Sequence, residues 1–269
     1  MSDSKTVPAR CGDTDFAVAA VEPYLSGTEP TPNGVTWEHF KGREYRVHHF
    51  GHGTLGIVYA LAVIGEATGR PDMFEPALAG AADVVSRNED EHGFLAPHSD
   101  PQQEYPGLGR YGYGWCAGPT GDAVAFRALA RVTGDPKWTD LVDRCWHTVT
   151  TSGLPERLEP GFWDNSAHCC GTAGVLGFAG DMMVERGVGG DFARILVADL
   201  DARATVEDGL VSWSNHEHRE DPPELAPRVP WGMGSSGIVR ELLRYSRVAT
   251  GGDPAYAQPL PEESAPRQA

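Results

Sequence analysis

Three cysteines, Cys116, Cys169 and Cys170, are the residues of this sequence best suited to bind a metal ion. Zinc sites of the catalytic type use three protein ligands and leave a fourth position open, and cysteine thiolate is a common ligand. Adjacent cysteines rarely form a disulfide with each other, because the peptide between them becomes awkward, but both can reach one metal from a tight turn. The sequence therefore predicts a zinc site, and buried structural thiols are the alternative interpretation.

The remaining two of the five cysteines, Cys11 in a polar leader and Cys145, are interpreted as ordinary thiols. The opening string MSDSKTVPARCGD lacks the apolar core of a signal peptide, and no apolar run reaches the roughly 18 residues that span a bilayer. We therefore expect a cytoplasmic protein with reduced thiols, since the cytoplasm does not sustain structural disulfides.

The charge balance argues against polyanionic partners. The 269 residues carry 22 Lys and Arg against 38 Asp and Glu, a formal net charge of -16. Such a surface repels phosphate backbones and anionic lipid head groups, so we expect no nucleic-acid partner and no membrane partner. With 40% hydrophobic residues, the chain has enough apolar side chain to bury a core.

The elements that must position the cysteines follow from a Gly-x-x-Gly pattern that occurs four times. The four strings are GHGTLGI, WCAGPTGD, CCGTAGV and WGMGSSGI, with first glycines 53 to 65 residues apart, which fits one helical hairpin per repeat. Segments such as GIVYALAVIGEATG follow the glycines and carry little charge, so they predict buried inner helices. Residues 72–86 and 137–150 alternate apolar and charged positions at helical spacing and predict amphipathic outer helices.

Alternating inner and outer helices predict an all-α fold, an α/α toroid of about four hairpins. The Gly-x-x-Gly motifs would begin the inner helices, where glycine allows backbones to approach closely. Superposed repeats place His52, Cys116 and Cys170 at one end, whereas the fourth repeat has no metal-type ligand. We expect three parts, namely an amino-terminal segment with one outer helix, the toroid domain and a disordered tail, over residues 1–34, 35–250 and 251–269.

The strings H-G-x-x-G, W-C-x-G and C-C-G-x-x-G, in this order, resemble the lanthionine synthetase C (LanC)-like family, and GFWDNSAHCCGTAG is especially similar to some members. The resemblance covers residues 35–250. It implies that Cys116, Cys169 and Cys170 bind Zn²⁺, as in the three-cysteine branch of the family. It also implies a ring of about seven hairpins, relative to which this chain is incomplete and shortened at its amino terminus.

The resemblance further implies a zinc-dependent peptide cyclase. Such an enzyme adds a cysteine thiolate of a dehydrated ribosomal precursor peptide to a dehydroamino acid, which gives a lanthionine-type thioether. His52 occupies the position of the family's active-site histidine, and an imidazole with an ordinary pKa near 6.5 can protonate the resulting enolate. The alternative interpretation of His52 is a histidine satisfied by the neighbouring backbone.

Several polar residues near the cysteine motifs are weaker candidates for substrate binding or for supporting the ligands. Tyr113 and Arg110 precede the first ligand and could bind the peptide or stabilise an enolate, although solvated surface side chains are the favoured interpretation at such loop positions. Asp164 and Asn165 could orient the loop that carries Cys169. His168, His216 and His218 could ligate a metal or transfer protons, although the HEHRE loop that carries His216 and His218 is more often simply solvated.

Two positions depart from the family pattern. Ala117 follows the first cysteine, where tyrosine or histidine is frequent, and Gly112 stands where an arginine is common. These departures leave a second function open, a non-catalytic zinc-containing LanC-like protein that binds or scaffolds a precursor peptide or a partner enzyme. A glycosidase on a similar toroid would need two carboxylates, and Asp122 is the only acid in the repeat motifs.

The incomplete ring also bears on assembly. An arc of hairpins exposes apolar edges that a closed ring would bury. We therefore expect either a homodimer or a partner protein that completes the toroid.

Overall fold

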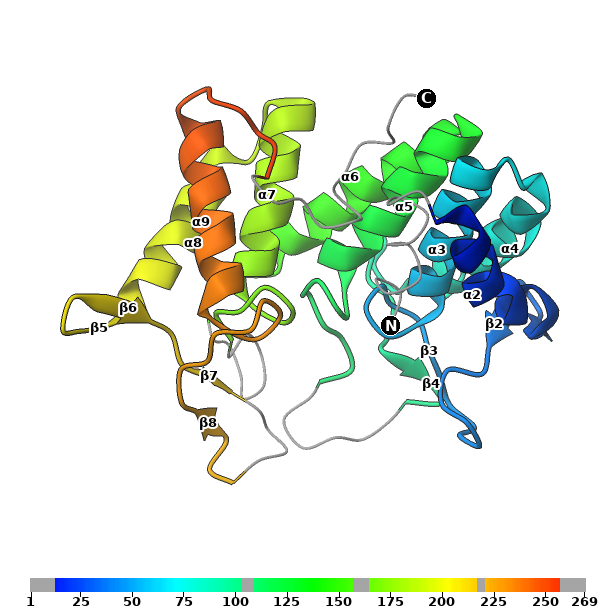
Figure 1. Ribbon diagram of the computed structural model, residues 1–269, viewed down its shortest axis with the longest axis horizontal. Helices are drawn as coiled ribbons and strands as arrows, with labels where there is room; N and C mark the ends of the chain where they lie inside the picture. The colour runs from blue at the N-terminus through cyan, green and yellow to red at the C-terminus, as the bar shows by residue number, and fades with distance from the viewer. Residues whose placement is uncertain (1–12, 103–108, 157–164, 217–220, 257–269) are drawn as a thin grey trace. The chain divides into compact units, whose positions relative to one another are not determined.

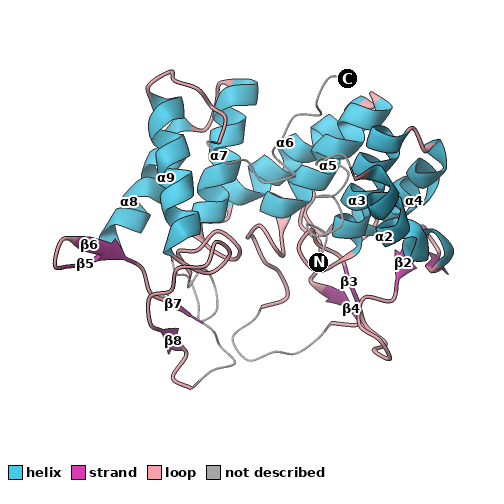
Figure 2. Cartoon of the chain, viewed as in Figure 1, coloured by secondary structure: helices cyan, strands magenta, loops and turns pink. Residues whose placement is uncertain are grey.

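The computed structural model describes residues 13–102, 109–156, 165–216 and 221–256. Helices dominate this part of the chain, and its strands are only two to four residues long (Figures 1 and 2). The predicted all-α class is therefore confirmed. None of the described helices is long and apolar enough to cross a membrane.

The helices alternate along the chain as the repeats predict. In order they are α2 (Thr14–Ser26), α3 (Thr54–Thr68), α4 (Phe74–Val85), α5 (Pro119–Thr133), α6 (Pro136–Thr151), α7 (Thr172–Arg186), α8 (Gly190–Ala202) and α9 (Ser235–Ala249), and the short 3-10 helix η1 (Pro71–Met73) precedes α4. Three consecutive hairpins, α3/α4, α5/α6 and α7/α8, thus lie between α2 and α9. This is the helical makeup of the predicted α/α toroid class.

Short antiparallel strand pairs lie in the loops between the helices. They are β1 (Thr28–Thr31) with β2 (Gly34–Trp37), β3 (Arg46–Val47) with β4 (Ser99–Asp100), β5 (Thr205–Glu207) with β6 (Leu210–Ser212), and β7 (Asn215–His216) with β8 (Glu224–Leu225). Each pair is an isolated two-stranded ribbon. The strands therefore fasten loops and do not form a layer of the core.

The chain forms two compact units, one built on α2 to α6 and the other on α7 to α9 together with residues 109–115. In the first unit α3 packs against α2, α4 and α5, and its residues from Thr54 to Gly65 are almost all buried. In the second unit α7 packs against both α8 and α9, and its residues from Thr172 to Gly180 are buried. Both helices are inner helices, as their low charge predicts.

The first glycine of each motif is the N-cap of an inner helix, at Gly53, Gly118, Gly171 and Gly234. In three of the four repeats the preceding loop folds back over the helix end. A Cβ atom at Gly171 would lie 2.3 Å from the carbonyl oxygen of Asn165, six residues earlier, and the equivalent gaps are 2.6 Å at Gly53 and 2.5 Å at Gly234. Only glycine fits so close to another backbone, so the predicted role of the motif is confirmed.

The fourth inner helix differs from the others. Its buried residues include the charged side chains of Glu241 and Arg244, which lie on the face of α9 that packs against α7. The sequence motif alone gave no indication of this buried charge.

Residues 251–256, at the start of the tail that the composition predicts to be disordered, make hydrogen bonds with α9. Arg244 donates from Nε to the carbonyl oxygen of Pro254 at 2.9 Å, and Arg247 donates from Nη2 to that of Ala255 at 2.9 Å. The segment therefore folds back along α9, since arginine side chains satisfy its carbonyl groups. Residues 257–269 lie outside the described part of the chain.

Candidate metal centre

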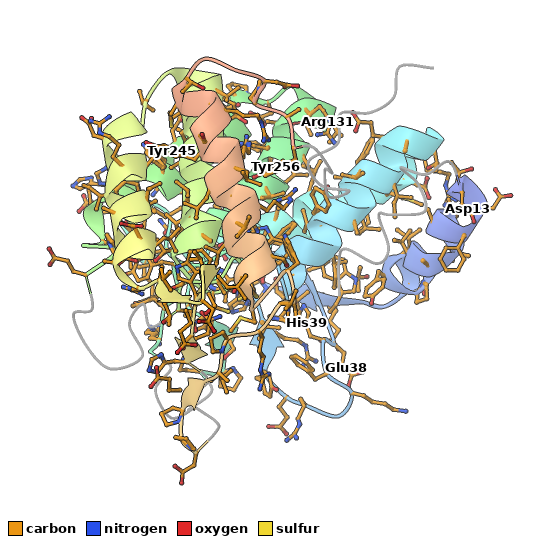
Figure 3. The ribbon with its side chains drawn as sticks, turned by 60° about the vertical axis from the view of Figure 1, so that its left-hand side comes forward. Asp13, Glu38, His39, Arg131, Tyr245 and Tyr256 are labelled. Carbon is orange, nitrogen blue, oxygen red and sulfur yellow. The ribbon has the colours of Figure 1, made fainter. Side chains whose placement is uncertain are left out.

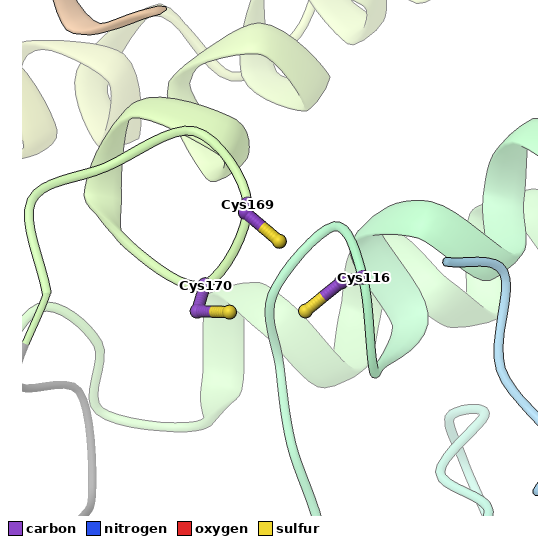
Figure 4. Close-up of side chains that lie close together, drawn as sticks. All are labelled: Cys116, Cys169 and Cys170. Carbon is purple, nitrogen blue, oxygen red and sulfur yellow. The ribbon is translucent and has the colours of Figure 1, made fainter. Parts of the chain in front are cut away.

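The side chains of Cys116, Cys169 and Cys170 point toward one another (Figure 4). Their Sγ atoms all lie within 4.8 Å of one another, Cys116 is buried and the two adjacent cysteines are half-buried. None of the four described cysteines forms a disulfide. The predicted cluster therefore exists as a set of reduced thiols.

This donor set fits a metal ion. A tetrahedral ion with bonds of about 2.3 Å to sulfur places its sulfur ligands about 3.8 Å apart, so the observed spacing needs closure by no more than about 1 Å. Three thiolates side by side repel one another strongly unless a cation neutralises them. The cluster is compatible with a three-cysteine metal site that leaves a further coordination position for another ligand.

The cysteines stand just before the first residues of two helices. Cys116 stands two residues before the N-cap of α5, and Cys170 stands directly before the N-cap of α7. The positive end of a helix macrodipole stabilises negative charge within about one turn, so both helices favour thiolate at these positions.

Close backbone packing within the second unit supports this convergence. A Cβ atom at Gly114 would lie 3.1 Å from the carbonyl oxygen of Cys169 and 3.1 Å from the Cα atom of Cys170. The next residue, Trp115, packs edge-on against Trp231 with 5.3 Å between ring centroids. The segment that leads into Cys116 therefore runs directly along the turn that carries the other two thiols.

Equivalent positions of successive repeats are hydrogen-bonded to each other. Gly51 donates its N–H to the carbonyl oxygen of Cys116 at 2.8 Å, and Cys169 donates its N–H to that of Gly232 at 2.8 Å. A Cβ atom at Gly51 would lie 2.7 Å from the Cα and Cβ atoms of Cys116, so only glycine fits there. The first repeat is thus hydrogen-bonded to the second, and the third to the fourth, through the residues that stand two places before their helix caps.

His52 follows Gly51 directly and is exposed. It lines a pocket together with Tyr24 of α2, Phe40 of the preceding loop and Ile57 of α3. The histidine is therefore accessible from solvent and lies one residue from the backbone contact with Cys116. This position suits a group that meets a bound substrate, which is the role predicted for it.

Asp122 of α5 secures the loop before His52. One carboxylate oxygen lies 2.7 Å from Nδ1 of His49 and the other accepts the N–H of Phe50 at 3.2 Å. Asp122 and His49 are both almost completely buried. Asp122, the acid of the second repeat motif, is thus engaged in a buried contact with His49.

Two asparagines hold the turn that carries Cys169 and Cys170. Oδ1 of Asn165 accepts the N–H of His216 at 2.7 Å. Buried Asn215 accepts the N–H of Ser166 at 3.1 Å and donates from Nδ2 to the carbonyl oxygen of Met233 at 2.6 Å. The sequence predicts such a role for Asn165, whereas no sequence motif marks Asn215 of β7.

The remaining candidates have varied positions. Arg110 is exposed and donates to the hydroxyl of Tyr111 at 3.2 Å, and Tyr113 is half-buried. His168 is 4% exposed. Asp164 and His218 lie outside the described residues.

Cys145 has the environment of an ordinary structural thiol. Cys145 on α6 is fully buried, and burial raises the pKa of its thiol well above the usual value. It therefore remains a neutral apolar group. Cys11 lies outside the described residues.

Comparison with known proteins identifies a family for this chain. The family model described as lanthionine synthetase C-like protein matches residues 19–182, which is more than half of the chain. The matched range contains His52, Cys116, Cys169 and Cys170, whereas the fourth glycine motif lies beyond it. No curated protein matches the chain. With this match over helices that carry the three-cysteine cluster, the chain belongs to the lanthionine synthetase C-like family.

Proposed function

We propose that this protein is a zinc-dependent peptide cyclase that adds a cysteine thiol of a dehydrated precursor peptide to a dehydroamino acid. The observation that supports it most directly is the three-thiol cluster on a chain of this family. A zinc ion bound there would supply an acidic site that keeps a substrate thiol deprotonated near neutral pH. Because three thiolates bring the formal charge of such a site to -1, the substrate sulfur would stay nucleophilic.

The reaction balances without an oxidant or a reductant. The thiolate sulfur forms a bond to Cβ of dehydroalanine or dehydrobutyrine while the electron pair of the carbon–carbon double bond moves to the enolate. His52, which is exposed and lines a pocket, delivers a proton to Cα. The proton lost from the thiol replaces the proton delivered by His52.

The direct test is incubation with a dehydrated peptide that contains one cysteine, followed by thiol alkylation and mass spectrometry. We expect a product of unchanged mass whose thiol can no longer be alkylated. Alkylation at the rate seen without protein would contradict the cyclase for that peptide. If the peptide still bound, that outcome would support the alternative of a zinc-containing protein that only binds a precursor, which the departures at Ala117 and Gly112 favour.

The second prediction concerns His52. The variant His52→Asn is expected to slow cyclisation by about 10²- to 10⁴-fold, because loss of a positioned acid typically costs that much. Its metal content should equal that of the wild type, since the proposed ligands are untouched. His92→Asn, a change at another exposed histidine, is the matched control. An unchanged cyclisation rate in His52→Asn would contradict the role of His52 as the proton donor.

A further inference from the structure

A buried polar network lies on α9, beside the turn that carries Cys169 and Cys170. Its centre is Glu241, which is 1% exposed and which neither the ligand set nor the proposed reaction uses. Nδ1 of His168 lies 3.2 Å from Oε1 of Glu241, and His168 directly precedes Cys169. The carboxylate of Glu241, on the fourth repeat, thus contacts the residue that directly precedes the two adjacent thiols.

The carboxylate of Glu241 is held from several sides. The hydroxyl of Tyr256 donates to Oε2 at 2.6 Å, and Nη1 of Arg240 donates to Oε1 at 2.9 Å. Arg244 extends the network, because its Nη1 donates to the Tyr256 hydroxyl at 3.1 Å and its Nη2 donates to Asp181 of α7 at 2.6 Å. Figure 3 shows Tyr256 beside α9. The position of Glu241 is therefore fixed independently of His168.

Glycines make room for this arrangement. A Cβ atom at Gly177 of α7 would lie 3.0 Å from Oε2 of Glu241, and one at Gly237 of α9 would lie 3.1 Å from Cβ of His168. The imidazole also packs against Trp231 at 4.5 Å and against Trp115 at 5.6 Å between ring centroids. The imidazole of His168 therefore packs against two indole rings with the carboxylate of Glu241 beside its Nδ1 atom.

Stability alone does not explain the buried charge. Replacement of a buried ion pair by well-packed apolar residues is frequently neutral or stabilising, whereas directional hydrogen bonds fix orientation. Groups that orient metal ligands from outside the ligand set commonly change metal affinity when they are replaced. The network thus has the properties expected of a support for the thiol turn.

We infer that Glu241 is a positioning residue which, through His168, holds Cys169 and Cys170 in the geometry that binds the metal ion. The inference rests on the metal site of the proposed function. It assigns a task to the fourth repeat, which contributes no ligand and lies outside the range matched by the family model. Tyr256 and Arg240 act one step further out, by orienting the carboxylate.

The test measures the affinity of the full-length protein for Zn²⁺ by competition with a chromophoric chelator, with absorption spectra of the Co²⁺-loaded protein alongside. We expect Glu241→Gln to weaken Zn²⁺ binding by about tenfold or more and to shift the Co²⁺ thiolate bands. Tyr256→Phe, which removes only the hydroxyl, should weaken binding by less, roughly threefold. The matched control is Glu207→Gln on the exposed strand β5, which should bind Zn²⁺ as the wild type does.

The outcomes separate this inference from the proposed function. Unchanged affinity and unchanged Co²⁺ spectra in both Glu241→Gln and Tyr256→Phe would overturn the positioning role while leaving the metal site intact. Wild-type protein that binds neither ion would overturn both. If Glu241→Gln does not fold, Tyr256→Phe decides, because loss of the hydroxyl that donates to Glu241 at 2.6 Å must change the metal site if the network positions the turn.

Discussion

Cys116→Ala is expected to lose stoichiometric zinc. The alanine keeps the Cβ atom that packs against Gly51, so the substitution removes only the sulfur atom from the cluster. Thiolate-rich zinc sites bind with about 10–16 kcal/mol, and an even share among four ligands makes each worth roughly 3 kcal/mol. Loss of one thiolate should therefore weaken binding more than a hundredfold.

The measurement is elemental analysis after dialysis, followed by chelator competition for the affinity. Wild-type protein should retain one zinc ion per chain, and Cys116→Ala should retain almost none. Cys145→Ala is the control, since that thiol is fully buried on α6 and lies outside the cluster. Stoichiometric zinc in Cys116→Ala would show that the ion is bound elsewhere.

The sequence was sufficient to predict the parts of the fold that repeat. The four Gly-x-x-Gly motifs identify the four inner-helix starts correctly, and in three of them a folded-back loop leaves no room for a side chain at the helix cap. The same alignment of repeats brought Cys116, Cys169 and Cys170 to one end, and the thiols do cluster. A motif that recurs at a regular spacing can be recognised in a single sequence without an alignment.

The contact between His168 and Glu241 was not predictable in this way. His168 and Glu241 are 73 positions apart, and no periodic pattern connects a residue of a loop to one on the buried face of a later helix. Composition likewise does not show that Arg244 and Arg247 donate hydrogen bonds to the carbonyl oxygens of Pro254 and Ala255. Tertiary partners decide such cases, and a single sequence does not identify them.

Mild acid is expected to unfold the unit built on α2 to α6. Burial lowers the pKa of His39 to about 4, of His48 to about 3 and of His98 to about 4, with a further contribution from Arg46 at His39, from Arg87 at His48 and from His49 at His98. The unfolded chain binds these protons below about pH 6.5, whereas the folded chain does not, so stability is complete above that pH and falls as the pH drops. By pH 4 each histidine should cost roughly 3 kcal/mol, against a total stability of about 5–15 kcal/mol.

The measurement is far-ultraviolet circular dichroism of metal-free protein between pH 7 and pH 3, because acid would also displace a metal from thiolates. His48→Leu is the decisive variant, since neither ring nitrogen of this fully buried side chain has a hydrogen-bond partner among the described residues. Leucine has a similar volume and no proton to bind, so the midpoint of acid unfolding should move to lower pH while neutral-pH stability is kept or raised. The same change at exposed His92 should leave the midpoint where it is. Superimposable acid titrations of His48→Leu and the wild type would mean that His48 is already protonated in the folded protein, and that its burial does not keep it neutral.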